Sequence, residues 1–153
     1  MSCSAVLLAI DWPQWRGNNR NGISPETGLL KSWPAGGPKQ VWKTTGLGEG
    51  YSAFSVVKDR LFTQGQHDNQ EFVMAFDVAT GKKVWETPAG AVYRDRRGHG
   101  PRGTPTIDGD RLYALSADGT LVCLEHATGK QVWGYNIVQK FRGGVPNWGI
   151  SES

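Results

Sequence analysis

Apolar and polar residues alternate in short runs through the middle and C-terminal parts of the chain, and glycine or proline residues separate these runs. The runs cover residues 55–57, 60–65, 71–77 and 83–88, and then 105–107, 111–116, 120–126 and 131–136. A period of two is typical of strands that bury one face, and turn residues between such runs indicate hairpins. No segment keeps the 3.6-residue period of an amphipathic helix. The pattern therefore predicts an all-β fold of short antiparallel strands.

The two groups of four runs are copies of one another. The segment "AFDVATGKKVW" at 75–85 returns as "CLEHATGKQVW" at 123–133, and each copy follows an Asp-Arg-Leu-aromatic run, at 59–62 and 110–113. A third tryptophan run, "KQVWKTT" at 39–45, has no preceding copy. Trp42, Trp85 and Trp133 follow one another at steps of 43 and 48 residues. A period in the forties with four strands per copy is typical of a β-propeller blade.

This repeat predicts a partial β-propeller over residues 11–153. We expect two complete four-stranded antiparallel blades at 52–89 and 103–138, an orphan outer strand around Trp42, and the start of a further blade at 139–153. Gly81 and Gly129 fall where a hairpin needs a positive φ. A single blade cannot bury its own faces, so we expect each tryptophan to pack against the next blade. Burial of one such side chain contributes about 2–3 kcal/mol.

Composition and charge narrow the class of protein. The 153 residues include 21 Gly, 8 Pro and 7 Trp, which suits many short strands and turns. The net charge of +3 is mild and is concentrated in one arginine-rich loop, whereas nucleic-acid binders spread a basic face over several elements; we expect no nucleic-acid partner. The apolar run Ala5–Ile10 is too short to span a membrane. Residues 1–10 are interpreted as the remnant of a secretion signal, or as an arbitrary N-terminus.

The repeat resembles a known family. The pattern Ala75-x-Asp77-x-x-x-Gly81-Lys82-x-x-Trp85 is similar to the tryptophan-docking motif of pyrroloquinoline-quinone (PQQ) type propellers, which form the quinoprotein alcohol-dehydrogenase-like superfamily. The second copy keeps three of these positions, Gly129, Lys130 and Trp133, and has Cys123 and Glu125 at two others. The opening "DWPQWRGNNRNGIS" also resembles the start of bacterial secreted PQQ-like repeat proteins. The resemblance implies a ring of six to eight blades and a periplasmic or secreted location.

The glycine-rich loops that connect one blade to the next are the candidate ligand sites. They cover residues 45–52, 90–103 and 138–149. Together they are predicted to place basic and aromatic side chains on one rim: Arg94, Arg96, Arg97, His99, Arg102, Lys140, Arg142 and Trp148. Arginine pairs and a stacking tryptophan suit a small anionic ligand, of which a quinone carboxylate is one example. The alternative is that these residues only shape and solvate the loops.

The sequence contains no complete catalytic set. Residues 66–71, "QHDNQE", are rich in oxygen ligands but lack the glycine and the spacing of a Ca²⁺ loop, and the three histidines show no metal-ligand spacing. We therefore predict no metal site and no catalytic residue in this segment. The favoured interpretation is a propeller-repeat module with a binding or scaffolding role in the bacterial cell envelope. The alternative is the N-terminal fragment of a PQQ-dependent dehydrogenase whose catalytic blades are missing. The expected partners are the remaining blades, further copies of the chain, another protein or a small anion.

Overall fold

The computed structural model describes residues 10–153, and its architecture is two four-stranded antiparallel sheets. The predicted signal remnant lies, except for Ile10, outside the described residues. Sheet 1 contains β1 (Ser55–Val57), β2 (Arg60–His67), β3 (Gln70–Asp77) and β4 (Lys83–Ala91). Sheet 2 contains β5 (Thr106–Asp108), β6 (Arg111–Leu115), β7 (Thr120–Glu125) and β8 (Gln131–Asn136). Each sheet is a meander in sequence order, which confirms the predicted all-β fold with two propeller blades.

The strands begin and end close to the predicted runs because turn residues bound each run. Lys58 and Gly109 take positive φ values of 54° and 55° between the first two strands of each sheet. Asp68 and Asn69 do so, at 46° and 61°, in the hairpin between β2 and β3. Gly81 and Gly129 have φ values of 68° and 74°, which confirms the predicted left-handed turn before each outer strand.

Two details differ from the expectations. The segment around Trp42 forms no strand in the part of the chain that the structure describes: it contacts sheet 1 through the Trp42 side chain but pairs with no strand edge. A short helix, α1 (Ile137–Phe141), follows β8 within the segment expected to lead into a further blade. The side chain of Asn136 caps it by accepting a hydrogen bond of 3.0 Å from the backbone N–H of Gln139. Residues 142–153 run on without a strand.

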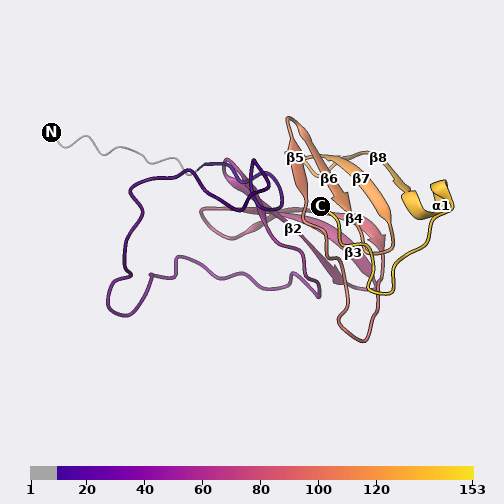
Figure 1. The fold of residues 1–153 in the computed structure, drawn as a ribbon, viewed down its shortest axis with the longest axis horizontal. Helices are drawn as coiled ribbons and strands as arrows, with labels where there is room; N and C mark the ends of the chain where they lie inside the picture. Colours follow the sequence, from indigo (N-terminus) through magenta and orange to yellow (C-terminus); the bar gives the residue numbers. More distant parts are fainter. Residues whose placement is uncertain (1–9) are drawn as a thin grey trace.

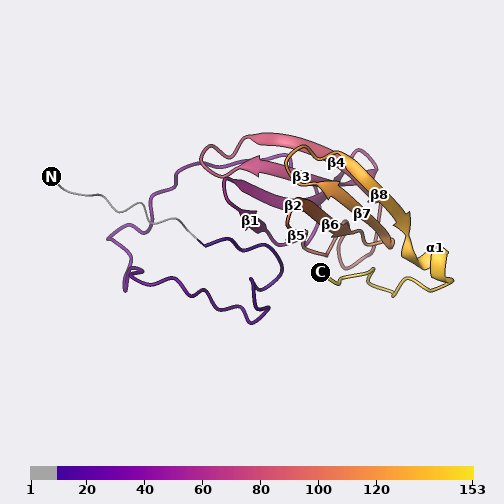
Figure 2. The same ribbon diagram turned by 90° about the horizontal axis from the view of Figure 1, so that it is seen from above.

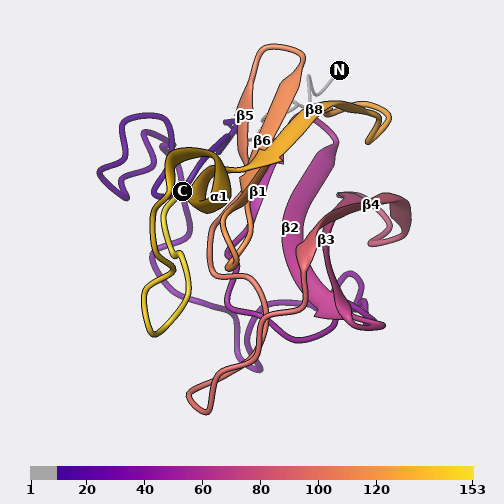
Figure 3. The ribbon, with the colours of Figure 1, turned by 90° about the vertical axis from the view of Figure 1, so that its right-hand side faces the viewer.

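The hydrophobic core lies between the two sheets. Figures 1 and 2 show the sheets side by side, and Figure 3 shows them from the end, with sheet 1 in magenta and sheet 2 in orange. Alternate residues of β2, β3 and β4 face alternate residues of β6 and β7, as the period of two requires. The core comprises Phe62, Val73, Ala75, Ala89, Ile107, Leu112, Ala114, Val122 and Leu124, with Val57 and Trp85 packed at its margin.

Trp85 joins the two sheets by a hydrogen bond as well as by packing. Its indole N–H donates over 3.1 Å to the backbone carbonyl of His126, in the turn that follows β7 of the next blade. Gly129 lies directly against the indole ring, since a Cβ atom there would stand 2.6 Å from two ring carbons. Thr87 completes the contact by donating its hydroxyl to the carbonyl of Gly129 over 2.6 Å. Only a residue without a side chain allows this approach.

The N-terminal segment repeats this contact on sheet 1. The indole N–H of Trp42 donates to the carbonyl of Val78 over 2.7 Å, and a Cβ atom on Gly81 would stand 2.5 Å from the Trp42 ring. Further upstream, Trp12 exchanges two backbone hydrogen bonds of 2.7 and 2.8 Å with Val56. The next residue, Pro13, accepts a hydrogen bond of 2.8 Å from the backbone N–H of Ile107. The segment therefore ties the first strands of both sheets together.

Because of the contact between Trp85 and Gly129, we expect a glycine-to-alanine substitution to destabilise the fold more at position 129 than at another positive-φ glycine. Gly129→Ala and Gly109→Ala both place a side chain at positive φ, which costs about 1 kcal/mol. Only Gly129→Ala also displaces an indole ring, because nothing lies within 4 Å of a Cβ atom on Gly109. We expect urea denaturation to show Gly129→Ala as less stable than Gly109→Ala by about 1–3 kcal/mol. Equal losses for the two variants would contradict a tight contact at Gly129.

Candidate functional site

The residues of the repeated motif lie at the turn before each outer strand. The carboxylate of Asp77 accepts hydrogen bonds from the backbone N–H and the hydroxyl of Thr80, over 2.8 and 2.7 Å, and these bonds hold the pKa of Asp77 below its usual value. In the second copy Glu125 occupies this place and accepts from the hydroxyl of Thr128 over 3.0 Å. Ala75 is buried beside Trp85, while Lys82 and Lys130 point to solvent.

Trp133 occupies the corresponding place on sheet 2 but meets no further blade. Tyr113, Cys123 and Trp133 form one row across sheet 2, in the register that Phe62, Ala75 and Trp85 have in sheet 1. The row on sheet 2 is exposed in part, with 39% of Trp133 accessible. The row on sheet 1 is covered by sheet 2. Both rows pair an aromatic residue and a tryptophan on either side of a small residue, but only the sheet 1 row is covered by a neighbouring sheet.

Part of the predicted rim cluster is brought together. The loop at 90–103 meets the loop at 45–52, where the hydroxyl of Tyr51 donates to the carbonyl of Arg97 over 3.1 Å. It also meets the C-terminal segment, where Arg97 donates to the carbonyl of Asn147 over 2.8 Å, next to the exposed Trp148. The three glycine-rich loops therefore lie on one rim.

Other predicted residues point elsewhere. The ammonium group of Lys140 lies 3.8 Å from the centre of the Tyr135 ring, and Arg142 ends helix α1 in a left-handed conformation. Arg94 donates to the side chain of Asn69 over 3.1 Å. Arg96 is exposed, and within residues 10–153 it forms no hydrogen bond or ion pair. None of these four side chains shares a hydrogen bond with Arg97 or Arg102 in residues 10–153.

The arginines that do converge are already paired within the loop. Arg97 donates from Nε to the carboxylate of Asp95 over 2.9 Å, and this pair lowers the pKa of Asp95 to about 2. Arg102 donates to the carbonyls of Gly100 and Gly98 over 2.7 and 3.0 Å, and His99 accepts from the backbone N–H of Asp95 over 3.2 Å. These contacts hold the loop in place and take up three of the five N–H donors of Arg97 and two of those of Arg102.

These contacts bear on PQQ, the cofactor that the resemblance implies. A quinone carboxylate needs free, convergent guanidinium groups, but Arg97 and Arg102 are engaged by the loop itself. No group of three or more His, Cys, Asp or Glu side chains in residues 10–153 has the geometry to hold a metal ion. The residues of this rim therefore do not fit a PQQ site by themselves.

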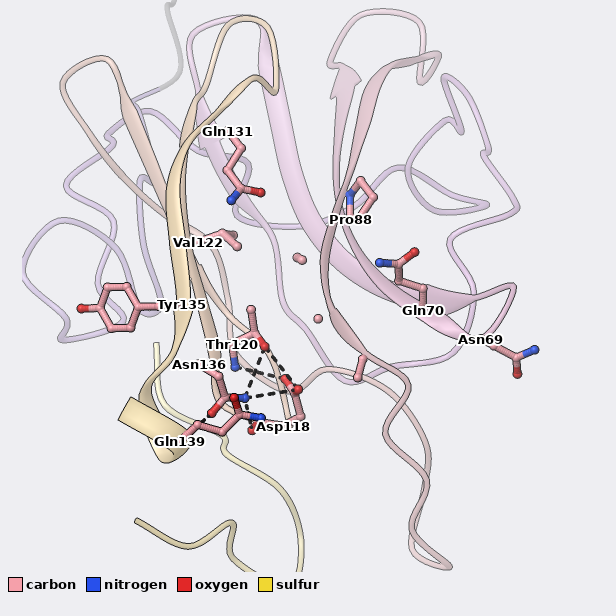
Figure 4. Close-up of a pocket in the computed structure, with 14 residues that line it drawn as sticks. Asn69, Gln70, Pro88, Asp118, Thr120, Val122, Gln131, Tyr135, Asn136 and Gln139 are labelled. Atoms are coloured by element: carbon pink, nitrogen blue, oxygen red, sulfur yellow. Dashed lines mark hydrogen bonds between the residues drawn. The ribbon is translucent and has the colours of Figure 1, made fainter. Parts of the chain in front are cut away.

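A second candidate site is a groove of about 560 Å³ between the two blades. One wall is the end of β4, residues 88–91, and the other is formed by β7 and β8. Figure 4 shows the groove with Gln131 at one end and with Asp118, Asn136 and Gln139 at the other. Val122 lies between these ends, so that the floor is apolar and the two ends are polar.

The polar end is a closed hydrogen-bond network around Asp118. One carboxylate oxygen of Asp118 accepts from the Ser116 hydroxyl and, over 3.0 Å, from the Thr120 N–H. The other accepts from the Thr120 hydroxyl over 3.2 Å and from the amide of Asn136 over 3.4 Å. Because both oxygens accept hydrogen bonds from the chain, Asp118 organises the end of the groove and has few lone pairs left for a ligand.

Glu71 lies behind the groove as a buried carboxyl group. Its strand neighbour across the sheet is Gly90, where a Cβ atom would stand 2.5 Å from Ser116 of the other blade. One oxygen of Glu71 accepts from the backbone N–H of Ala117 over 3.1 Å, and the other has no partner within the described chain. Burial raises the pKa of Glu71 to about 7; the N–H of Ala117 opposes this rise, as does Arg102, while Asp118 adds to it.

Sequence reasoning missed Glu71 and the groove. The sequence could have pointed to Glu71, because it occupies the same face of β3 as the core residues Val73 and Ala75. A carboxyl group at a core-facing position is uncommon and marks a special environment. The groove carried no such signal, since its walls come from residues about thirty to seventy positions apart that are individually ordinary.

The stacked meanders define a class of protein. Two four-stranded blades of one repeat, packed face to face through an outer-strand tryptophan, are the building plan of a β-propeller. No helix in residues 10–153 has the length and apolarity needed to cross a membrane.

Residues 23–150 match the model of a PQQ-type repeat family described as "Outer membrane protein assembly factor BamB". The chain therefore belongs to this PQQ-like propeller family, which confirms the resemblance in the repeat. No curated protein sequence matches the chain.

Solved structures with a similar fold belong to larger proteins. BamB from Moraxella catarrhalis is 23% identical over 61% of this chain and 30% of its own, with a TM-score of 0.46. Quinohemoprotein alcohol dehydrogenase ADHIIG from Pseudomonas putida HK5 is 20% identical over 62% of this chain and 14% of its own, with a TM-score of 0.44. A europium-containing methanol dehydrogenase is 16% identical over 62% of this chain and 17% of its own, with a TM-score of 0.43. This chain thus spans less than a third of each.

The environment of Glu71 predicts a stability that falls as the pH rises. The pKa of Glu71 is about 7 in the folded chain and about 4.5 in the unfolded chain, so the folded state binds the proton more tightly. The contribution of Glu71 to stability is therefore fully present below pH 4.5 and is lost as the pH rises to about 7, by about 3 kcal/mol in total. Glu71→Gln keeps an acceptor for the Ala117 N–H but carries no charge.

We expect urea denaturation between pH 5 and about 8 to show a smaller fall in stability for Glu71→Gln than for the unaltered chain. Glu152→Gln is the matched control, because it removes one carboxyl group from an exposed position. Parallel pH profiles for the unaltered chain and Glu71→Gln would show that Glu71 is not the buried proton-binding group.

Proposed function

We propose that this chain is a propeller-repeat module with a binding or scaffolding role in the bacterial cell envelope. The observation that carries the proposal is the match of residues 23–150 to a family described as an outer membrane protein assembly factor. The rim loops and the inter-blade groove are the two surfaces to which we assign contacts with other proteins. Chemistry on a substrate is not part of this role.

The envelope location is tested by osmotic-shock fractionation of the producing bacterium, with an antibody against the chain. We expect the chain in the periplasmic fraction or with the membranes, alongside a periplasmic marker enzyme. Recovery of the chain with a cytosolic marker would overturn the proposed location.

The repeated motif is proposed to act as the connection between blades. Ala75, Asp77, Gly81, Lys82 and Trp85 form its first copy, and Gly129, Lys130 and Trp133 belong to the second. Trp42 lies on Gly81 and Trp85 lies on Gly129, so each tryptophan packs on the glycine of the following copy. By the same rule Trp133 is expected to pack on a further blade, or on another copy of the chain.

The open face around Trp133 predicts association of the purified chain. Tyr113, Trp133 and Tyr135 leave aromatic surface uncovered, which favours contact between copies. We expect size-exclusion chromatography with light scattering to give a mass above the 16.7 kDa of one chain, and Trp133→Lys to shift it toward the monomer. Gln40→Lys adds the same charge at an exposed position outside both sheets and serves as control. A monomeric unaltered chain would contradict this role of the face.

PQQ enters only through the family resemblance, and the paired arginines of the rim argue against a complete site in these blades. Titration of the chain with PQQ and Ca²⁺, followed by tryptophan fluorescence, separates the two functions. No quenching is expected. Saturable quenching together with PQQ-dependent reduction of an electron-acceptor dye would favour the alternative, a dehydrogenase.

A further inference from the structure

We propose that the groove between the two blades binds an uncharged, extended polypeptide segment of a partner protein. The inference deepens the proposed binding role and rests on it, because it names the class of partner and the surface that holds it. The argument uses the size of the groove, its charge and the kinds of side chain that line it.

The dimensions of the groove suit one extended segment. The groove is open to solvent on one side, and its volume of about 560 Å³ lies within the size range of ligand-binding clefts. Its long wall is β8, whose six residues Gln131–Asn136 span about 17–20 Å at the usual rise per residue. A partner segment of about five or six residues in extended form has the same length. Figure 4 shows lining side chains from one end of this wall to the other.

The charge of the groove selects a neutral occupant. No Lys, Arg or His side chain lines it, and its single carboxylate, Asp118, is engaged through both oxygens by the chain itself. An anionic segment would find no cation to pair with, and a cationic one would find no free carboxylate. Burying an unpaired charge in the groove would cost free energy, so uncharged residues are favoured.

The side chains of the groove match the polar groups of a peptide backbone. Gln70, Gln131 and Gln139 line it, and within residues 10–153 their amide groups form no hydrogen bond. Each such amide offers both a donor and an acceptor, which is the pair of groups that every peptide unit presents. Between them the floor at Ala89 and Val122 is apolar and can receive a small aliphatic side chain.

Two features decide how the segment binds and what it is. Pro88 in the β4 wall has no backbone N–H, so this edge cannot provide a regular strand ladder, and the glutamine amides must supply the polar contacts.

A sugar would need an aromatic face to stack on. Tyr135 is the one aromatic residue that lines the groove, and its ring points away from it and stacks on Trp133, with 5.6 Å between ring centres. A polypeptide is therefore favoured over a glycan.

The test selects peptides from a phage-displayed library of random linear peptides on the immobilised chain. The enriched peptides are then labelled with fluorescein, and their binding is measured by fluorescence anisotropy. Gln131→Arg places a charge and extra volume in the groove. Gln40→Arg makes the same change at an exposed position outside both sheets and is the matched control. Neutral tetrasaccharides are offered as competitors.

We expect uncharged peptides whose dissociation constant rises about tenfold or more with Gln131→Arg and less than about twofold with Gln40→Arg, because the first removes at least one hydrogen-bonded contact. Binding should be unchanged between about 0.05 and 0.5 M NaCl, since no ion pair is involved. Failure to enrich a peptide, equal effects of the two variants, or displacement by a tetrasaccharide would overturn the proposal. So would enrichment of acidic peptides whose binding weakens with salt. None of these results affects the fractionation test, so the peptide-binding proposal can be overturned while the proposed envelope role stands, and the reverse also holds.

Discussion

The contact between an outer-strand tryptophan and a glycine of the next blade is the constraint on which the rest of the structure depends. A four-stranded meander has two apolar faces and cannot bury either by itself. Trp85 helps to bury one face of sheet 1 by packing on Gly129 and donating a hydrogen bond to His126. The contact fixes the distance and the register between the sheets. Every feature at their boundary, from the core at Phe62 to the groove beside β8, follows from that register.

The same contact explains why the sequence repeats. The glycine must have a positive φ to turn the chain into the outer strand, and it must also lack a side chain to receive the indole ring. One residue therefore meets two requirements, so the pair Gly-Lys and the following tryptophan keep their spacing in both copies. The other positions are freer. Glu125 replaces Asp77 because either carboxylate can accept from the turn threonine.

The fold was largely predictable from the sequence, and the candidate site much less so. Strand limits depend on local alternation and on turn residues such as Gly81 and Gly109, and both can be read along the chain. The orphan strand at Trp42 was not found as a strand, because a strand needs a neighbour that alternation alone does not supply. The rim arginines were placed correctly in loops. Their pairing with Asp95 and with loop carbonyls depends on the three-dimensional course of the loop.

The side chains at the boundary between the blades change from apolar at one end to polar at the other. Near Trp85 it is apolar and closely packed, which suits a contact that only has to hold. Toward Glu71 and Asp118 it becomes polar, and a buried carboxyl group there costs stability above pH 4.5. Packing alone would favour an aliphatic residue at position 71, because its neighbours of the same parity are Val73 and Ala75. Glu71 instead accepts a hydrogen bond from the Ala117 N–H of the other blade, which an aliphatic residue cannot do, and the groove opens beside this polar connection.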